Sequence, residues 1–266
     1  MNHRPRKRFG QHFLTDEHVV AAIAGHVAGR GQPTVIEIGP GTGALTAGLI
    51  ARGLAVRAVE LDRDLVPRLR ERFPAAGVEI FEADVLSVDF TRLGAPEPLV
   101  VCGNLPYNVS SPILFRLATL KDALDSMTFM LQKEVVDRML AAPGSKAYGR
   151  LSVMLQLDFT GERVLDVPPA AFTPPPRVDS GVVALYPRPL PSRVACRETL
   201  GRVVSAAFGR RRKTLRNALA GLTDPAGLEA VGIDPGARAE TVPVEAFVAL
   251  ANRISEAGTG ADHGPR

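Results

Sequence analysis

The chain has 266 residues, of which 45% are hydrophobic, and a formal net charge of +4. This length and apolar content suffice to bury a core in one or two domains, which excludes peptide-like and mainly disordered proteins. Mean hydropathy is +0.07, and no apolar run approaches the roughly 20 residues of a membrane span. The basic start is not followed by the hydrophobic stretch of a secretory signal. We therefore expect a soluble, cytoplasmic protein.

Between residues 34 and 131, short apolar runs alternate with helix-like stretches, as in a doubly wound α/β sheet. We predict buried strands at residues 34–38, 55–60, 78–82, 99–102 and 127–131. Helices are predicted at residues 16–28, 43–51, 64–73 and 133–140, with another beginning near Ser110, where serine can cap a helix. The fold class that we predict is α/β.

After Tyr148 the pattern changes. We predict a helix at residues 150–156, strands at 157–164 and 180–186, and helices at 194–208, 214–222 and 244–254. The proline-rich stretches at 168–176 and 187–191 favour a fixed loop and a linker. We therefore divide the chain into a domain of residues 1–187 and a small helical domain of residues 188–266, whose tail from residue 258 we expect to be flexible.

The two cysteines, Cys102 and Cys196, stand in apolar surroundings without the spacing of metal ligands. A disulfide framework or a metal site is therefore not expected. We expect both side chains to lie in the core, where free cysteine behaves as a small apolar residue.

The predicted strand at residues 34–38 runs directly into a glycine-rich loop that contains Gly39 and Gly41. Glycines permit a tight turn and a close approach of the backbone to a ligand. The spacing is G-x-G-x-G, which differs from the G-x-G-x-x-G of dinucleotide enzymes, and Pro40 removes one N–H that a pyrophosphate would use. The loop therefore predicts a cofactor site for a ligand without phosphates.

Two acids follow at the ends of the next strands. Glu60 stands where a carboxylate can accept both hydroxyls of a ribose, and Asp84 where one can accept an adenine amino group. Taken singly, each is more typical of a solvated strand end. The order strand, glycine loop, helix, strand and acid favours an adenosine cofactor, and the acids suit the cationic sulfonium of S-adenosylmethionine.

Together with these features, the sequence Asn104, Leu105, Pro106, Tyr107 after the fourth strand resembles the class I (Rossmann-like) adenine-N6 methyltransferases. An adenine amino group is a poor nucleophile, and acceptors for its two N–H groups would align it and stabilise the developing positive charge. The Asn104 side-chain oxygen and the Leu105 carbonyl are candidates for these acceptors. Pro106 would fix the turn, and Tyr107 would stack on an extruded base, although simple packing is its alternative role.

Four further segments, at residues 8–14, 133–138, 172–180 and 208–219, resemble the bacterial small-subunit rRNA adenine-N6,N6-dimethyltransferases, the KsgA or RsmA family. That resemblance implies dimethylation of two adjacent adenosines in the 3′-terminal hairpin of 16S rRNA during assembly of the 30S subunit, by a monomer. It implies that Phe172 closes the other face of the base. The cofactor contacts implied are His12, Leu14, Gly39, Gly41, Glu60, Asp84 and Asn104. The family often has asparagine where this chain has His12, which retains hydrogen-bonding groups.

Basic residues gather at both ends of the chain. Residues 1–10 carry four bases and no acid, and residues 193–216 carry eight bases and one acid. Such clusters suit phosphate contacts that position RNA without reading its sequence, although solvated surfaces explain isolated clusters equally well. The candidate RNA-binding residues are Arg6, Lys7, Arg8, Arg210, Arg211, Arg212, Lys213 and Arg216.

Two other functions fit parts of the sequence. The large-subunit rRNA adenine methyltransferases of macrolide resistance share the cofactor loop and a motif like that at residues 104–107. A noncatalytic RNA-binding assembly factor could also be built on this scaffold. The arginine-rich segment at 208–219 and the segment at 177–180 favour the small-subunit enzymes, and the intact motif with both cofactor acids favours catalysis.

Overall fold

The fold described here is that of a computed structural model. It describes residues 12–74, 77–93, 98–107, 109–189, 194–210 and 212–260. Within these residues the chain forms two compact units. The first comprises the parts numbered 1–136 and 160–187, and the second comprises 137–159 and 188–266. In the described part of the chain, no helix has the length and apolar character needed to cross a membrane.

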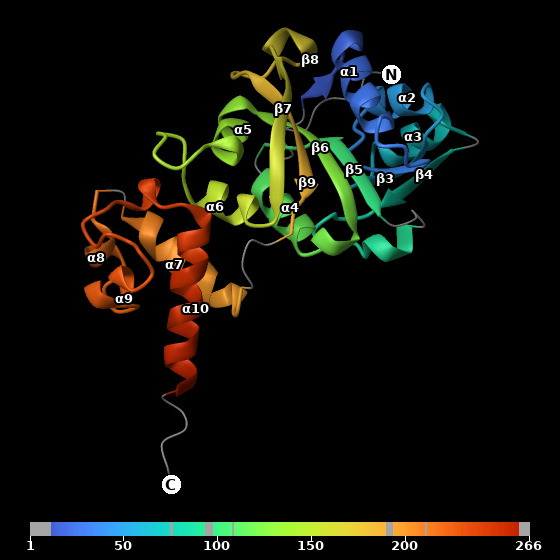
Figure 1. Ribbon diagram of the computed structural model, residues 1–266. Coiled ribbons are helices and arrows are strands. Elements are labelled where there is room, and N and C mark those ends of the chain that lie inside the picture. The colour runs from blue at the N-terminus through green and yellow to red at the C-terminus, as the bar shows by residue number, and fades with distance from the viewer. Residues whose placement is uncertain are drawn as a thin grey trace. The chain divides into compact units, whose positions relative to one another are not determined.

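The first unit is built on a seven-stranded sheet with the strand order β4-β3-β2-β5-β6-β9-β7 (Figure 1). Its strands are β2 (Thr34–Ile38), β3 (Ala55–Glu60), β4 (Val78–Glu82), β5 (Leu99–Asn104), β6 (Leu124–Gln132), β7 (Phe159–Val167) and β9 (Ser180–Pro187). Strands β4, β3, β2, β5 and β6 are parallel, whereas β9 runs antiparallel to β6. The carboxyl ends of the parallel strands therefore lie at one edge of the sheet, where open α/β sheets bind ligands.

Helices connect these strands, because parallel neighbours need crossover connections. The helices of this part are α1 (Glu17–Ala28), α2 (Ala44–Ile50), α3 (Val66–Arg72), α4 (Ser110–Ala118) and α5 (Lys133–Leu140), and short 3-10 turns span Phe90–Leu93, Lys121–Ala123 and Pro169–Ala171. Asp16 caps α1 by accepting hydrogen bonds from the backbone N–H groups of His18 and Val19. Apolar side chains of α1, α2 and α3 share one core with those of β2 and β3.

A second, two-stranded sheet joins distant parts of the sequence. Strand β1 (Phe13–Leu14) pairs antiparallel with β8 (Phe172–Thr173), so that Leu14 lies opposite Phe172. The backbone N–H of Thr15 extends the contact by donating to the carbonyl of Ala171 at 2.9 Å. This pairing fixes the segment that leads into α1 against the proline-rich segment before β9.

The second unit is helical. It contains α6 (Arg150–Gln156), α7 (Arg197–Gly209), α8 (Leu215–Ala218), α9 (Pro225–Glu229) and α10 (Val244–Gly260), with a 3-10 turn at Ala239–Thr241 (Figure 1). Buried side chains of α6, α7 and α10 form its core, including Val153, Leu157, Val203 and Phe247.

The predicted α/β class is confirmed, and the strands at 34–38, 55–60 and 78–82 have the predicted bounds. Residues 157–158 were predicted in a strand, but Leu157 follows the last turn of α6 and is fully buried in the core of the second unit. The helix predicted at 214–222 ends at Ala218, because the chain turns through Gly221 at a φ of +93°.

The predicted domain boundary differs from the division in the structure. Residues 137–159 precede the proposed boundary at 187–188, yet they belong to the second unit because α6 packs in its core. The flexible tail from residue 258 stays a prediction: α10 ends at Gly260, and residues 261–266 lie outside the described part.

The two cysteines differ in their surroundings. Cys102 is fully buried in β5, as predicted. Cys196 was predicted to lie in the core as well, but it is only half-buried and caps α7, where its sulfur accepts the backbone N–H of Thr199 at 3.5 Å. The prediction failed because a thiol can serve as a weak cap in a position where serine is more usual.

Candidate active site

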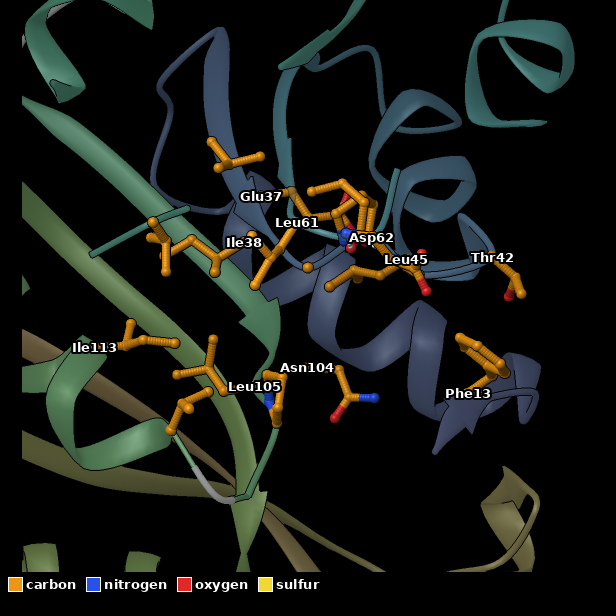
Figure 2. Close-up of a pocket in the computed structure, with 18 of the residues that line it drawn as sticks. Phe13, Glu37, Ile38, Thr42, Leu45, Leu61, Asp62, Asn104, Leu105 and Ile113 are labelled. Atoms are coloured by element: carbon orange, nitrogen blue, oxygen red, sulfur yellow. Dashed lines mark hydrogen bonds between the residues drawn. The ribbon is translucent and has the colours of Figure 1, made fainter. Parts of the chain in front are cut away.

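One pocket lies at the carboxyl ends of the parallel strands (Figure 2). Its lining comes from the stretches 12–14, 37–45, 59–62, 83–86 and 104–113. Figure 2 shows Glu37, Leu61 and Asp62 grouped at the strand ends, with Asn104 and Leu105 below them. Sequence reasoning placed candidates in all five stretches, and the structure brings them together around a single cavity.

The glycine loop between β2 and α2 lines this pocket. Gly39 and Gly41 have φ angles of +66° and +60°, which side-chain-bearing residues rarely adopt. A Cβ at position 41 would lie 3.1 Å from the ring of Phe13. The loop therefore needs glycine both for its backbone angles and for the close approach of the N-terminal segment.

Glu60, the last residue of β3, points into the pocket and is 6% exposed. Its two carboxylate oxygens accept the backbone N–H groups of Asp62 at 2.8 Å and Gly41 at 3.1 Å. Burial raises the pKa of Glu60, and these two hydrogen bonds oppose that shift. Because each carboxylate oxygen has a second lone pair, Glu60 can still accept hydroxyl groups of a ligand while its orientation is fixed.

Glu37 also lines the pocket, although no role was predicted for it from the sequence. It is 1% exposed, and its carboxylate accepts the Thr46 hydroxyl at 2.6 Å. Burial raises the pKa of Glu37 to about 7, against the effect of the Thr46 hydrogen bond, and the charge of Glu60 adds to the increase. The signal that could have identified it is an acid inside an otherwise apolar buried strand.

Asp84 and two leucines also line the pocket. The Asp84 side chain is exposed and accepts the backbone N–H of Leu86 at 2.9 Å. Leu61 and Leu86 line the pocket and remain 54% and 38% exposed, unusual for large apolar side chains. Such surfaces suit the faces of a flat ring whose polar edge faces a carboxylate. Neither leucine was singled out from the sequence.

Asn104 ends β5 at the pocket edge. Its side-chain nitrogen donates to the backbone carbonyl of His12 at 2.9 Å, which leaves its side-chain oxygen free of that bond and able to accept. The backbone N–H of Leu105 is bound to the carbonyl of Met130, which fixes the peptide after Asn104. Leu105, Pro106 and Tyr107 all line the same cavity.

Tyr107 is anchored through its hydroxyl. The oxygen lies 2.6 Å from the Ser180 hydroxyl at the start of β9, and burial raises the pKa of the phenol. Tyr107 is half-buried, so part of its ring remains accessible from the pocket.

Phe172, predicted to face the same base, does not line the pocket in this structure. It is 3% exposed and packs in the core of the first unit, because its strand β8 pairs with β1 directly opposite Leu14. Leu14 itself does line the pocket, together with His12.

The predicted RNA-binding residues are only partly described. Arg6, Lys7, Arg8 and Arg211 lie outside the described residues. Arg210, Arg212 and Lys213 lie between the end of α7 and the short helix α8 of the second unit, Arg216 lies within α8, and all four are exposed. They place four positive charges within seven residues on the surface of that unit. Among the described residues no group of three or more His, Cys, Asp or Glu side chains could hold a metal ion.

Comparison with known sequences gives consistent matches over nearly the whole chain. A family model described as ribosomal RNA adenine dimethylase matches residues 2–256. The ribosomal RNA small subunit methyltransferase A of Chromobacterium violaceum is 51% identical over 257 residues, covering 96% of this chain and 98% of that protein. The protein of the same name from Laribacter hongkongensis is 50% identical with the same coverage.

Solved structures with a similar fold include a dimethyladenosine transferase and a 23S rRNA methyltransferase. A dimethyladenosine transferase from Plasmodium falciparum has a TM-score of 0.79 and 25% identity, covering 93% of this chain and 98% of that one. The 23S rRNA methyltransferase ErmE has a TM-score of 0.70 and 28% identity, covering 91% of this chain and 99% of that one.

Proposed function

This chain belongs to the ribosomal RNA adenine dimethylase family, and from that premise we propose that it dimethylates N6 of two adjacent adenosines in the 3′-terminal hairpin of 16S rRNA. Membership in the family implies an RNA substrate and a methyl donor of the S-adenosylmethionine type. The single observation that carries the proposal is the position of Asn104 and Tyr107 beside the glycine loop and Glu60 in one pocket.

The residues present fit S-adenosylmethionine. Phosphate recognition favours a lysine or an arginine in the pocket. Among the described residues, neither lines this one. The acids that do line it suit a ligand with hydroxyl, amino and cationic groups. Glu60 would hold the ribose hydroxyls, Asp84 the adenine amino group, and the exposed faces of Leu61 and Leu86 the adenine ring.

When bound, S-adenosylmethionine supplies a methyl group on a positively charged sulfur. Glu60 and Asp84 would hold this donor, adenine N6 would receive its methyl group, and the methylated nitrogen would release a proton to solvent. The Asn104 side-chain oxygen and the Leu105 carbonyl would accept the two N6 hydrogens and stabilise the charge that develops there. Tyr107 would hold the extruded base by stacking. Phe172 would contribute by fixing Leu14 and the N-terminal segment at the pocket edge; closing the second face of the base would require it to leave the core.

The small ribosomal subunit is the favoured substrate. The relatives at about 50% identity are named as small-subunit methyltransferases, whereas ErmE, a 23S rRNA methyltransferase, is only 28% identical. Exposed Arg210, Arg212, Lys213 and Arg216 would contact RNA phosphates, as would Arg211 and the leader residues Arg6, Lys7 and Arg8. We propose a monomer that acts on immature 30S particles in the cytoplasm.

The test uses 30S and 50S particles from cells that lack this methylation. Incubation with methyl-labelled S-adenosylmethionine should label 30S particles, and mass spectrometry of the rRNA should find four methyl groups on two adjacent adenosines. Labelling of 50S particles instead would favour the macrolide-resistance type of activity. Binding to 30S particles without methyl transfer would favour the noncatalytic assembly factor.

A further inference from the structure

The imidazole of His12 lies against Tyr107. The two ring centroids are 5.8 Å apart and the rings are inclined by 27°, an offset-stacked arrangement. His12 was predicted as a cofactor contact, and its position in the lining agrees with that, but its ring packs on the residue assigned to the target base. The side chain therefore lies on the side of the pocket where the target base is proposed to bind.

Two hydrogen bonds fix His12 in this position. Its Nδ1 lies 2.8 Å from the carbonyl oxygen of Pro174, and because a carbonyl can only accept, Nδ1 must carry the proton. Its own backbone carbonyl accepts the side-chain nitrogen of Asn104 at 2.9 Å. One residue thus contacts the proline-rich segment, the Asn104 amide and the Tyr107 ring.

Tyr107 is consequently held at two places. His12 lies against one face of its ring, and the Ser180 hydroxyl holds its phenolic oxygen at 2.6 Å. A base that stacks on Tyr107 would therefore use the opposite face. With the hydroxyl anchored, that face keeps a fixed position relative to Asn104. Such fixed geometry is what methyl transfer between two precisely placed atoms requires.

We propose that the His12 side chain is a positioning residue for the target adenine, which acts through Tyr107, and that its imidazole contributes little to cofactor affinity. This inference rests on the proposed rRNA adenine methylation. The backbone carbonyl of His12 then orients the Asn104 side chain, and its imidazole ring orients Tyr107. All His12 variants retain the carbonyl, so the ring can be tested alone.

The first experiment needs no substrate. The chain has no tryptophan and three tyrosines, so its intrinsic emission comes from tyrosine. Removing the imidazole with His12→Ala should uncover one face of Tyr107 and increase acrylamide quenching of the emission, and the increase should be absent in a Tyr107→Phe background. His18→Ala, which removes an exposed histidine of α1, is the matched control. Unchanged quenching in His12→Ala would overturn the stacking contact.

The second experiment separates base positioning from cofactor binding. In His12→Ala, we expect the single-turnover rate of methyl transfer to 30S particles at saturating cofactor to fall about 2- to 10-fold, which is the rate change that the loss of one aromatic pair corresponds to. The dissociation constant for S-adenosylhomocysteine should stay within about twofold. His12→Phe, which keeps a ring, should restore most of the rate, whereas His12→Asn, which keeps only a hydrogen-bonding group, should not.

Three results would overturn the proposal. Weaker cofactor binding with an unchanged rate at saturation would assign the ring to the cofactor. Rescue by His12→Asn alone would assign the effect to the Pro174 hydrogen bond. A faster His12→Ala enzyme would mean that the imidazole occupies the place of the base. If the wild-type protein transfers no methyl group to 30S particles, the proposed function fails, and the quenching result still decides the His12–Tyr107 contact.

Discussion

The two sides of the pocket are built in different ways. The cofactor side, from Gly39 to Asp84, consists of strand ends and loops that follow one another along the chain. The base side joins His12, Asn104 and Tyr107 with Pro174 and Ser180, which are separated by up to 168 residues. Backbone angles and backbone hydrogen bonds shape the first side, whereas side-chain contacts between distant segments shape the second.

Because the two sides are built differently, substitutions on each side should change a different kinetic constant. A change on the cofactor side should alter cofactor affinity, and enough cofactor should overcome it. A change on the base side should alter the rate of methyl transfer at any cofactor concentration. The following predictions are ordered from the largest expected effect to the smallest.

Asn104→Ala removes the proposed acceptor for the N6 hydrogens. We expect the single-turnover rate of methyl transfer to fall roughly 10³-fold, comparable with the loss of one preorganised group that stabilises transition-state charge. Affinity for S-adenosylhomocysteine should change only a few-fold, and circular dichroism should confirm the native fold. A loss of cofactor affinity that accounts for the whole effect would remove the distinction between the two sides.

Glu60→Gln alters the cofactor side. A hydrogen bond to a charged group contributes ~1.5–3 kcal/mol, so we expect the dissociation constant for S-adenosylmethionine to rise roughly 10- to 100-fold, measured by calorimetry. The matched control is Glu82→Gln, because Glu82 lies opposite Glu60 in the β3–β4 pair but is exposed and outside the pocket lining. Equal effects of the two substitutions would contradict the assignment of Glu60.

Glu37, at the cofactor side, makes the free energy of unfolding depend on pH. Its pKa is raised from 4.5 to about 7, so the native state binds this proton more tightly than the unfolded chain. Its contribution to the free energy of unfolding is therefore complete below pH 4.5 and is lost as pH rises toward and through 7. At about 1.4 kcal/mol per pKa unit, the loss is on the order of 3–4 kcal/mol.

Glu37→Gln should remove that slope, since glutamine stays neutral and can still accept the Thr46 hydroxyl. Urea unfolding at pH 5 and pH 8 measures the difference between wild type and variant. Thr46→Val provides a second check, because losing this hydrogen bond should raise the pKa of Glu37 further and move the slope to higher pH. The same slope in wild type and Glu37→Gln would assign it to another group.

The exposed cluster in the second unit should affect neither side of the pocket directly. Replacing Arg212, Lys213 and Arg216 by glutamine should weaken binding to immature 30S particles about tenfold and lower the slope of log affinity against log salt by about 2. The control replaces exposed arginines of the first unit, Arg63, Arg68 and Arg92. Cofactor affinity should stay constant in both variants, and an unchanged salt slope in the first would exclude these phosphate contacts.

The contrast between the two sides also explains how much the sequence could predict. The strands at residues 34–38, 55–60 and 78–82 were predicted with their observed bounds. Strand β2 is buried from Val35 to Ile38, as expected of a central parallel strand. Strand β4 lies at the edge of the sheet with Glu79 and Glu82 exposed, so the prediction that it is a buried strand was wrong. The carboxyl ends of β2 and β3 carry the glycine loop and Glu60, so many of the residues that line this part of the pocket could be located from spacing alone. Glu37 and the two exposed leucines were missed, because their position in a pocket depends on the folded chain.

The base side could be predicted from the sequence only in part. The motif at residues 104–107 could be located by its resemblance to a family, but the stacking of His12 on Tyr107 depends on the β1–β8 pairing between residues 13–14 and 172–173. No periodicity in the sequence indicates such a short pairing over so long a distance. The same pairing buries Phe172, which motif-based reasoning placed against the base.

The most direct test of the two-sided pocket is the single-turnover rate of methyl transfer to 30S particles, measured against cofactor concentration for Glu60→Gln and Asn104→Ala side by side. We predict that Glu60→Gln reaches nearly the wild-type rate once the cofactor is raised about 100-fold, whereas Asn104→Ala saturates at the wild-type cofactor concentration with a rate roughly 10³-fold lower. Recovery of Asn104→Ala at high cofactor, or a saturated rate in Glu60→Gln as low as that of Asn104→Ala, would contradict this account.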